Sequence, residues 1–130
     1  MVFITAGDPD LDATKNILDV IDDSGVDIIE LGVPFSDPLA DGPIIQASAL
    51  RALKSGTTLR KILSLVKDIR KNRDLPIVLM TSFNPVFVYG EKQFVEDAVS
   101  AGVDGVIVPD LPPEESIQFS ACGEKKGLDV

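Results

Sequence analysis

Four short apolar runs alternate with longer amphipathic segments along this chain, which leaves few architectures open to it. The apolar runs cover residues 2–5, 28–31, 76–80 and 106–108, and each is typical of a β-strand. Strands built from continuous apolar residues, rather than from alternating ones, are buried on both faces and are therefore parallel. The pattern predicts an α/β protein with a parallel sheet.

The segments between these strands carry hydrophobic residues every three or four positions, the spacing of a helix that buries one face. Helices are expected over residues 11–24, 44–53, 59–69 and 113–125, and in a segment that ends at Gly102. Thr57 is the expected N-cap of the 59–69 helix. Asn84–Pro85 is expected to form a turn, and residues 128–130 are typical of the start of a fifth strand.

The length of the repeating unit indicates the size of the complete fold. Four strand–helix units in 130 residues average about 32 residues each, close to one eighth of the roughly 250 residues of a (β/α)8 barrel. Residues 25–30 also resemble residues 102–107, because both have a helix-ending glycine, a turn and a strand. Residues 1–130 are therefore expected to form a single domain. It is either part of a TIM barrel or an open, doubly wound sheet such as a flavodoxin-like fold.

Composition excludes several classes of function. The 21 acidic residues outnumber the 12 basic ones, and a net charge of -9 disfavours binding to nucleic acid or to an anionic membrane surface. No apolar run approaches the roughly 20 residues that cross a bilayer. Cys122 is the single cysteine and there is no histidine, so disulfide scaffolds, zinc fingers and histidine-based catalytic centres are excluded. No set of metal ligands is expected, and the expected location is the cytoplasm.

Glu30 is the residue that points most sharply to catalysis. It interrupts an apolar strand, where an ionised side chain is rarely found. A surrounding of low polarity raises the pKa of a carboxyl group, which suits proton transfer near neutral pH. The alternatives are a glutamate at the exposed end of a strand or one in a buried ion pair.

Asp41 follows eleven residues later, in the loop Leu39-Ala40-Asp41-Gly42-Pro43. Ligands of parallel α/β folds bind at the carboxyl ends of the strands, where this loop begins. Two carboxylates held there can divide the roles of acid and base between them. The alternative is a turn residue, because Asp-Gly is a common turn dipeptide.

Three stretches of this sequence closely resemble the tryptophan synthase alpha subunit family. They are residues 3–9, residues 108–116 and, above all, the fourteen residues from Glu30 to Pro43 with their many glycines, prolines and aspartates. The resemblance extends along the whole chain. It implies a (β/α)8 TIM barrel, here about the first four βα units. It also implies a lyase that cleaves indole-3-glycerol phosphate to indole and glyceraldehyde 3-phosphate in tryptophan biosynthesis.

The resemblance also implies roles for individual residues. Glu30 matches the family's general acid/base, and Asp41 matches the carboxylate that binds the indole N–H and stabilises charge on the ring. Apolar positions that line the family's indole pocket match Phe3, Met80 and Ile107. Positions that contact the family's beta subunit, in a heterotetramer, match Pro34, Asp37, Asn84 and Pro112. No cofactor is expected on this chain, since pyridoxal phosphate belongs to the beta subunit.

The chain departs from the family pattern at two places. Ser82 stands where the family often has tyrosine, which is expected to leave the pocket wall smaller or wetter. The family's phosphate site lies in the second half of the barrel, beyond the residues present here. The chain is therefore expected to be the first half of an alpha subunit, without appreciable activity alone. The alternative is a non-catalytic half-barrel that associates with a partner chain through its unpaired strand edges.

Overall fold

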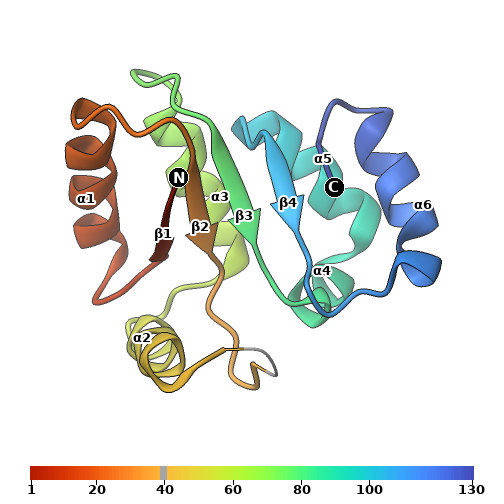
Figure 1. Ribbon diagram of the computed structural model, residues 1–130, viewed down its shortest axis with the longest axis horizontal. Coiled ribbons are helices and arrows are strands. Elements are labelled where there is room, and N and C mark those ends of the chain that lie inside the picture. Colours follow the sequence, from red (N-terminus) through yellow and green to blue (C-terminus); the bar gives the residue numbers. More distant parts are fainter. Residues whose placement is uncertain (39–40) are drawn as a thin grey trace.

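The computed structural model describes residues 1–38 and 41–130. Its centre is a four-stranded parallel sheet of β1 (Val2–Thr5), β2 (Ile29–Gly32), β3 (Ile77–Met80) and β4 (Gly105–Ile107). The strands lie in the order β1-β2-β3-β4, so each strand neighbours the next one along the chain (Figure 1). A doubly wound sheet reverses its strand order partway across. The flavodoxin-like alternative is therefore wrong, and the sheet winds in one direction as a barrel does.

Six helices are present in the described part of the chain. They are α1 (Leu11–Asp23), α2 (Pro43–Lys54), α3 (Leu59–Ile69), α4 (Phe83–Tyr89), α5 (Glu91–Ala101) and α6 (Pro113–Glu124). Along the outside of the sheet, α1 contacts α3, α3 contacts α5 and α5 contacts α6. Figure 1 shows α2 and α4 at the end toward which the strand arrows point. None of the described helices combines the length and apolarity needed to cross a membrane.

The two faces of the sheet differ in burial. Ile29, Leu31, Ile77 and Leu79 point toward the helices and are almost completely buried. The alternate side chains, such as Glu30, point to the other face and are half-buried. The prediction of strands buried on both faces is therefore confirmed on the helix side only. Four strands form an open arc, and the described residues place no second layer across its inner face.

Two local predictions were wrong. Thr58, not Thr57, caps α3 by accepting a hydrogen bond from the backbone N–H of Lys61, while Thr57 is buried. Asn84 and Pro85 lie inside α4 instead of forming a turn. Pro85 is the third residue of that helix, where a missing N–H leaves no intrahelical bond unmade. The expected start of a fifth strand is confirmed, because Asp129 forms a parallel bridge with Gly105, the first residue of β4.

The turn before β4 holds the amino-terminal ends of two strands together. The carboxylate of Asp104 accepts a hydrogen bond of 2.7 Å from the backbone N–H of Ile77, at the start of β3. The same carboxylate forms an ion pair with Arg70, whose Nε donates a 2.7 Å hydrogen bond to the carbonyl of Gly102. This cluster lies at the opposite end of the strands from the loops described below.

Candidate active site

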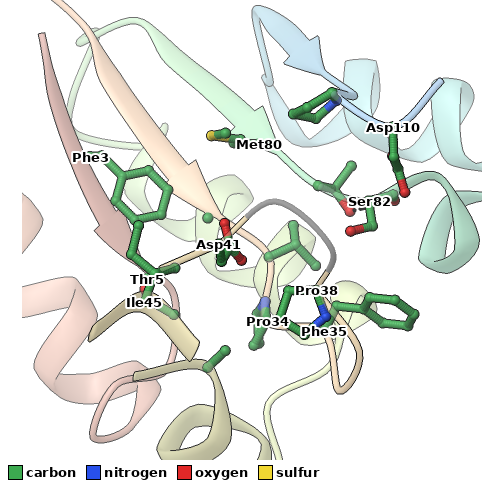
Figure 2. Close-up of a pocket in the computed structure, with 15 residues that line it drawn as sticks. Phe3, Thr5, Pro34, Phe35, Pro38, Asp41, Ile45, Met80, Ser82 and Asp110 are labelled. Atoms are coloured by element: carbon green, nitrogen blue, oxygen red, sulfur yellow. Dashed lines mark hydrogen bonds between the residues drawn. The ribbon is translucent and has the colours of Figure 1, made fainter. Parts of the chain in front are cut away.

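A cavity opens at the carboxyl ends of β1, β2 and β3, between the strand ends and the loop that leads to α2 (Figure 2). Its wall is largely apolar, and the polar groups in it are few. The apolar residues include Phe3, Val33, Pro34, Ile45 and Met80, and the polar ones are Thr5, Asp41, Thr81, Ser82 and Asp110. Such a cavity, apolar with a few placed polar groups, is the usual form of a site for a small organic molecule.

The ring of Phe3 reaches across the neighbouring strand to form part of this wall. A Cβ atom at Gly32 would lie 2.6 Å from Cζ of Phe3, closer than van der Waals contact allows. The absence of a side chain at Gly32, at the end of β2, therefore leaves the space that the Phe3 ring occupies. Met80 lies at the same level, because it pairs in register with Gly32. Phe3 and Met80, both predicted as pocket residues, do line this cavity.

Asp41 lies where the cavity meets the start of α2. Figure 2 shows its side chain between Phe3 and Met80 on one side and Pro34 and Phe35 on the other. The residue is half-buried. The structure thus brings Asp41 together with two predicted apolar wall residues, which a mere turn residue would not require.

Glu30 lies on the inner face of the sheet, two residues before Gly32 on β2 and therefore further from the carboxyl ends of the strands. It pairs in register with Phe3 on one side and with Val78 on the other, so the three side chains share the inner face. Glu30 is half-buried and is not a wall residue of the cavity in the part of the chain described. Gly32, two residues further along β2, does line the cavity. Because position 32 has no side chain, that space is filled by the ring of Phe3, the strand neighbour of Glu30.

Ile107, the third predicted pocket residue, pairs with Met80 at the end of β4. Its side chain is 40% exposed, and it does not line the cavity within the described residues. The neighbouring polypeptide instead contributes Pro109 and Asp110 to the wall. Ile107 therefore faces the open inner side of the arc.

The residues predicted to meet a partner occupy the rim around the cavity. Asp37 is exposed in the loop after β2, Asn84 is exposed in the first turn of α4, and Pro112 is the exposed N-cap of α6. Pro34 is buried and lines the cavity, so it is part of the inner side of this loop and not of the exposed rim. Leu39 and Ala40, in the signature loop, lie outside the described residues.

Asp110 has a structural role that the sequence did not reveal. Its Oδ1 accepts a hydrogen bond of 2.8 Å from the backbone N–H of Phe83, the first residue of α4. Ser82, the N-cap of that helix, makes no capping bond with its own side chain. A carboxylate from the loop after β4 thus caps a helix in the loop after β3. Only the tertiary fold places these two segments together, and no local sequence signal indicates this.

The first turn after β1 is fastened to α2. Asp8 accepts hydrogen bonds of 2.8 and 2.6 Å from Nε and Nη2 of Arg51. This hydrogen bonding by the Arg51 guanidinium lowers the pKa of the Asp8 carboxyl group. The hydroxyl groups of Thr5 and Ser48 are also 2.7 Å apart, joining the end of β1 to the middle of α2. Helix α2 is therefore held against the cavity at two points.

The described residues, 1–38 and 41–130, contain no group of three His, Cys, Asp or Glu side chains close enough to hold a metal ion. The titratable groups in the cavity wall are the two carboxylates, Asp41 and Asp110. Asp110 is already used to cap α4. Asp41 is therefore the wall carboxylate without a capping role in the described residues.

A family model described as the tryptophan synthase alpha chain matches residues 1–130, the whole length of the chain. The chain belongs to the tryptophan synthase alpha chain family. It is 59% identical over 130 residues to the tryptophan synthase alpha chain of Geotalea uraniireducens and 56% identical to that of Geobacter sulfurreducens. In both comparisons the chain spans 49% of the relative. The chain therefore covers about half the length of the curated relatives it matches.

Solved structures of the same family also match the fold of this chain. The tryptophan synthase alpha subunit of Legionella pneumophila matches with a TM-score of 0.94 at 43% identity, over 98% of this chain and 49% of that one. A structure of the tryptophan synthase α2β2 complex of Pyrococcus furiosus matches with a TM-score of 0.93 at 44% identity, over 98% of this chain and 54% of that one. The predicted family and the predicted partial TIM barrel are both confirmed.

Proposed function

We propose that this chain provides the two catalytic carboxylates of a lyase that cleaves indole-3-glycerol phosphate to indole and glyceraldehyde 3-phosphate. One observation carries the proposal: the Asp41 side chain enters an apolar cavity at the strand ends, on the sheet face that also carries Glu30. A flat aromatic ring fits a wall of Phe3 and Met80. The family membership supports the same reaction.

In the proposed mechanism, Glu30 gives its proton to the ring carbon that carries the glycerol chain. The ring then has the character of an iminium ion, and Asp41 stabilises this charge by accepting a hydrogen bond from the ring N–H. A carboxylate, Glu30 once it is ionised, next takes the proton of the adjacent glycerol hydroxyl. The carbon–carbon bond breaks as the aldehyde forms, and its electron pair returns to the ring. Indole and glyceraldehyde 3-phosphate result, and no cofactor takes part.

The proposed partner is a tryptophan synthase beta subunit. Its contact area on this chain would be the cavity rim, where Asp37, Asn84 and Pro112 are exposed. Since Pro34 is buried, its proposed contribution is to fix the shape of the loop that carries Asp37. Pyridoxal phosphate would then belong to the partner, and the assembly would work in the cytoplasm.

The test uses a joined chain, in which the C-terminal half of the Geotalea uraniireducens relative follows Val130. This joined chain should release indole from indole-3-glycerol phosphate. Asp41→Asn should lower kcat about 100-fold, the usual effect of removing one group that stabilises transition-state charge. Asp27→Asn, a matched change of an exposed aspartate before β2, should leave kcat unchanged. A folded joined chain without turnover contradicts the proposal.

A non-catalytic half-barrel that docks a partner chain is the second candidate function. The observation that favours it is the half-buried inner face of the sheet, where Ile107 is 40% exposed. Two measurements together distinguish the candidates: light scattering on the 130-residue chain mixed with a partner chain, and turnover by the joined chain. A stable complex with a partner chain, formed by a chain that supports no turnover when joined, would favour docking.

A further inference from the structure

One residue of α2 holds the backbone at the point where Asp41 enters the cavity wall. Nε2 of Gln46 donates a hydrogen bond of 2.7 Å to the carbonyl oxygen of Asp41. The backbone N–H of Gln46 donates a second hydrogen bond, of 3.0 Å, to the carbonyl oxygen of Gly42. Gln46 therefore binds two consecutive carbonyl groups, which fixes the orientation of the peptide between them.

Little else in this segment restrains Asp41. Gly42 is the N-cap of α2 and, having no side chain, adds no capping hydrogen bond of its own. Within the described residues, the Asp41 carboxylate accepts no hydrogen bond, and its position therefore depends on the backbone that carries it. Gln46 is exposed and does not line the cavity as described, so it has no contact with a molecule bound there.

The helix that carries Gln46 is itself firmly placed. Ser48 is buried, and its hydroxyl lies 2.7 Å from that of Thr5 at the end of β1. One turn further on, Arg51 forms its two-point ion pair with Asp8. A side chain on such a fixed helix can hold a loop with the precision that a catalytic group needs.

We propose that Gln46 is a positioning residue: it keeps the Asp41 carboxylate directed into the cavity through its hydrogen bond to the Asp41 carbonyl. The inference rests on the proposed function, in which Asp41 stabilises charge on the substrate ring. Without the hydrogen bond, the peptide before Gly42 is free to rotate and the carboxylate turns away from the ring. Small displacements of this kind reduce the chemical step more than they reduce binding.

The first experiment measures kcat and KM of the joined chain. Gln46→Glu keeps the shape of the side chain but removes the donor, and it should lower kcat about tenfold with KM unchanged. Gln46→Lys keeps a donor and should restore most of the loss. In an Asp41→Asn background, Gln46→Glu should have little further effect, because the two residues act through one group. Unchanged kcat, or an equal loss in both backgrounds, would overturn the proposal.

The second experiment does not depend on activity. In the 130-residue chain labelled with ¹³C, the carbonyl resonance of Asp41 should move in Gln46→Glu and return toward its original position in Gln46→Lys. An unmoved resonance in Gln46→Glu overturns the proposal, whatever the kinetics show. Turnover that survives Asp41→Asn contradicts the proposed function instead, while the carbonyl resonance still decides whether Gln46 holds this peptide.

Discussion

At the scale of single residues, the cavity depends on one absent side chain. Gly32 leaves the space that the ring of Phe3 occupies, because a Cβ atom there would lie 2.6 Å from Cζ and 2.8 Å from Cε2 of the ring. Phe3 in turn forms the wall opposite the loop that carries Asp41. The requirement for glycine at this position is therefore one of space, set by a residue on the adjacent strand.

Replacing Gly32 by serine should displace the Phe3 ring and destabilise the fold by about 1–3 kcal/mol, the usual cost of forcing extra atoms into a packed site. Gly42→Ser is the matched control, because a Cβ atom at Gly42 would meet no atom within 4 Å and serine is a good N-cap. Urea unfolding of both variants gives the two free energies. Equal stability of Gly32→Ser and the parent chain would show that the ring is not confined as described.

At the scale of elements, the ion pair between Asp8 and Arg51 fastens the loop after β1 to α2. The pKa of Asp8 is lower in the folded chain, because Arg51 stabilises the charged form. A lowered pKa in the folded state adds stability above the pKa of the unfolded chain, about 3.9, and that stability is lost as the pH falls through the lower, folded value.

Asp8→Asn should therefore reduce the free energy of unfolding at neutral pH, and the difference from the parent chain should shrink as the pH falls below about 3.9 and through the lower, folded value. Urea unfolding across this range measures the effect, with Asp27→Asn as the control for a general change of charge. A difference that is the same at both ends of the range would mean that the pair contributes nothing through ionisation.

The elements also show how far the sequence could be interpreted alone. Apolar runs and helical spacing predicted all four strands and five of the helices, because local hydrophobic patterns carry that information. Helix α4 was missed, since Asn84-Pro85 is typical of a turn and the cap of this helix comes from Asp110, far away in the chain. Thr57 was mistaken for the N-cap because two adjacent threonines offer the same local signal and only packing separates them.

Part of the candidate site could likewise be predicted from the sequence, and part could not. Glu30 stood out by interrupting an apolar strand, and Asp41 by its place in a distinctive loop. That Glu30 shares a sheet face with Phe3 follows from strand register and could be anticipated. The contact of Ser48 with Thr5 joins segments that the tertiary fold brings together, and the local contact of Gln46 with the Asp41 carbonyl depends on the path of an irregular loop. No residue pattern predicts either contact.

At the scale of the whole molecule, the strand order β1-β2-β3-β4 and the open inner face describe an arc of a barrel. The chain covers 49% of its Geotalea uraniireducens relative. The proposed substrate carries a phosphate, and barrels of this class bind phosphate in loops after the seventh and eighth strands. Binding energy from such a remote group positions the reacting part of a substrate.

The 130-residue chain alone should therefore release indole at least about 1000-fold more slowly than the joined chain, since it has both carboxylates but no phosphate loops to position the substrate. A coupled assay for glyceraldehyde 3-phosphate, run on both proteins at equal concentration, measures the ratio. Comparable rates of the two proteins would contradict the prediction, because they would mean that residues 1–130 need no phosphate loops to position the substrate.

The account depends most on Glu30 as the proton donor to the ring, and kcat of the Glu30→Gln joined chain tests this directly. Glutamine keeps the size of the side chain but has no proton to give at neutral pH. The predicted result is a loss of indole release of about 100- to 10,000-fold, the range for removal of a general acid or base, with an unchanged unfolding midpoint. A Glu30→Gln chain that releases indole at nearly the parent rate would contradict the account.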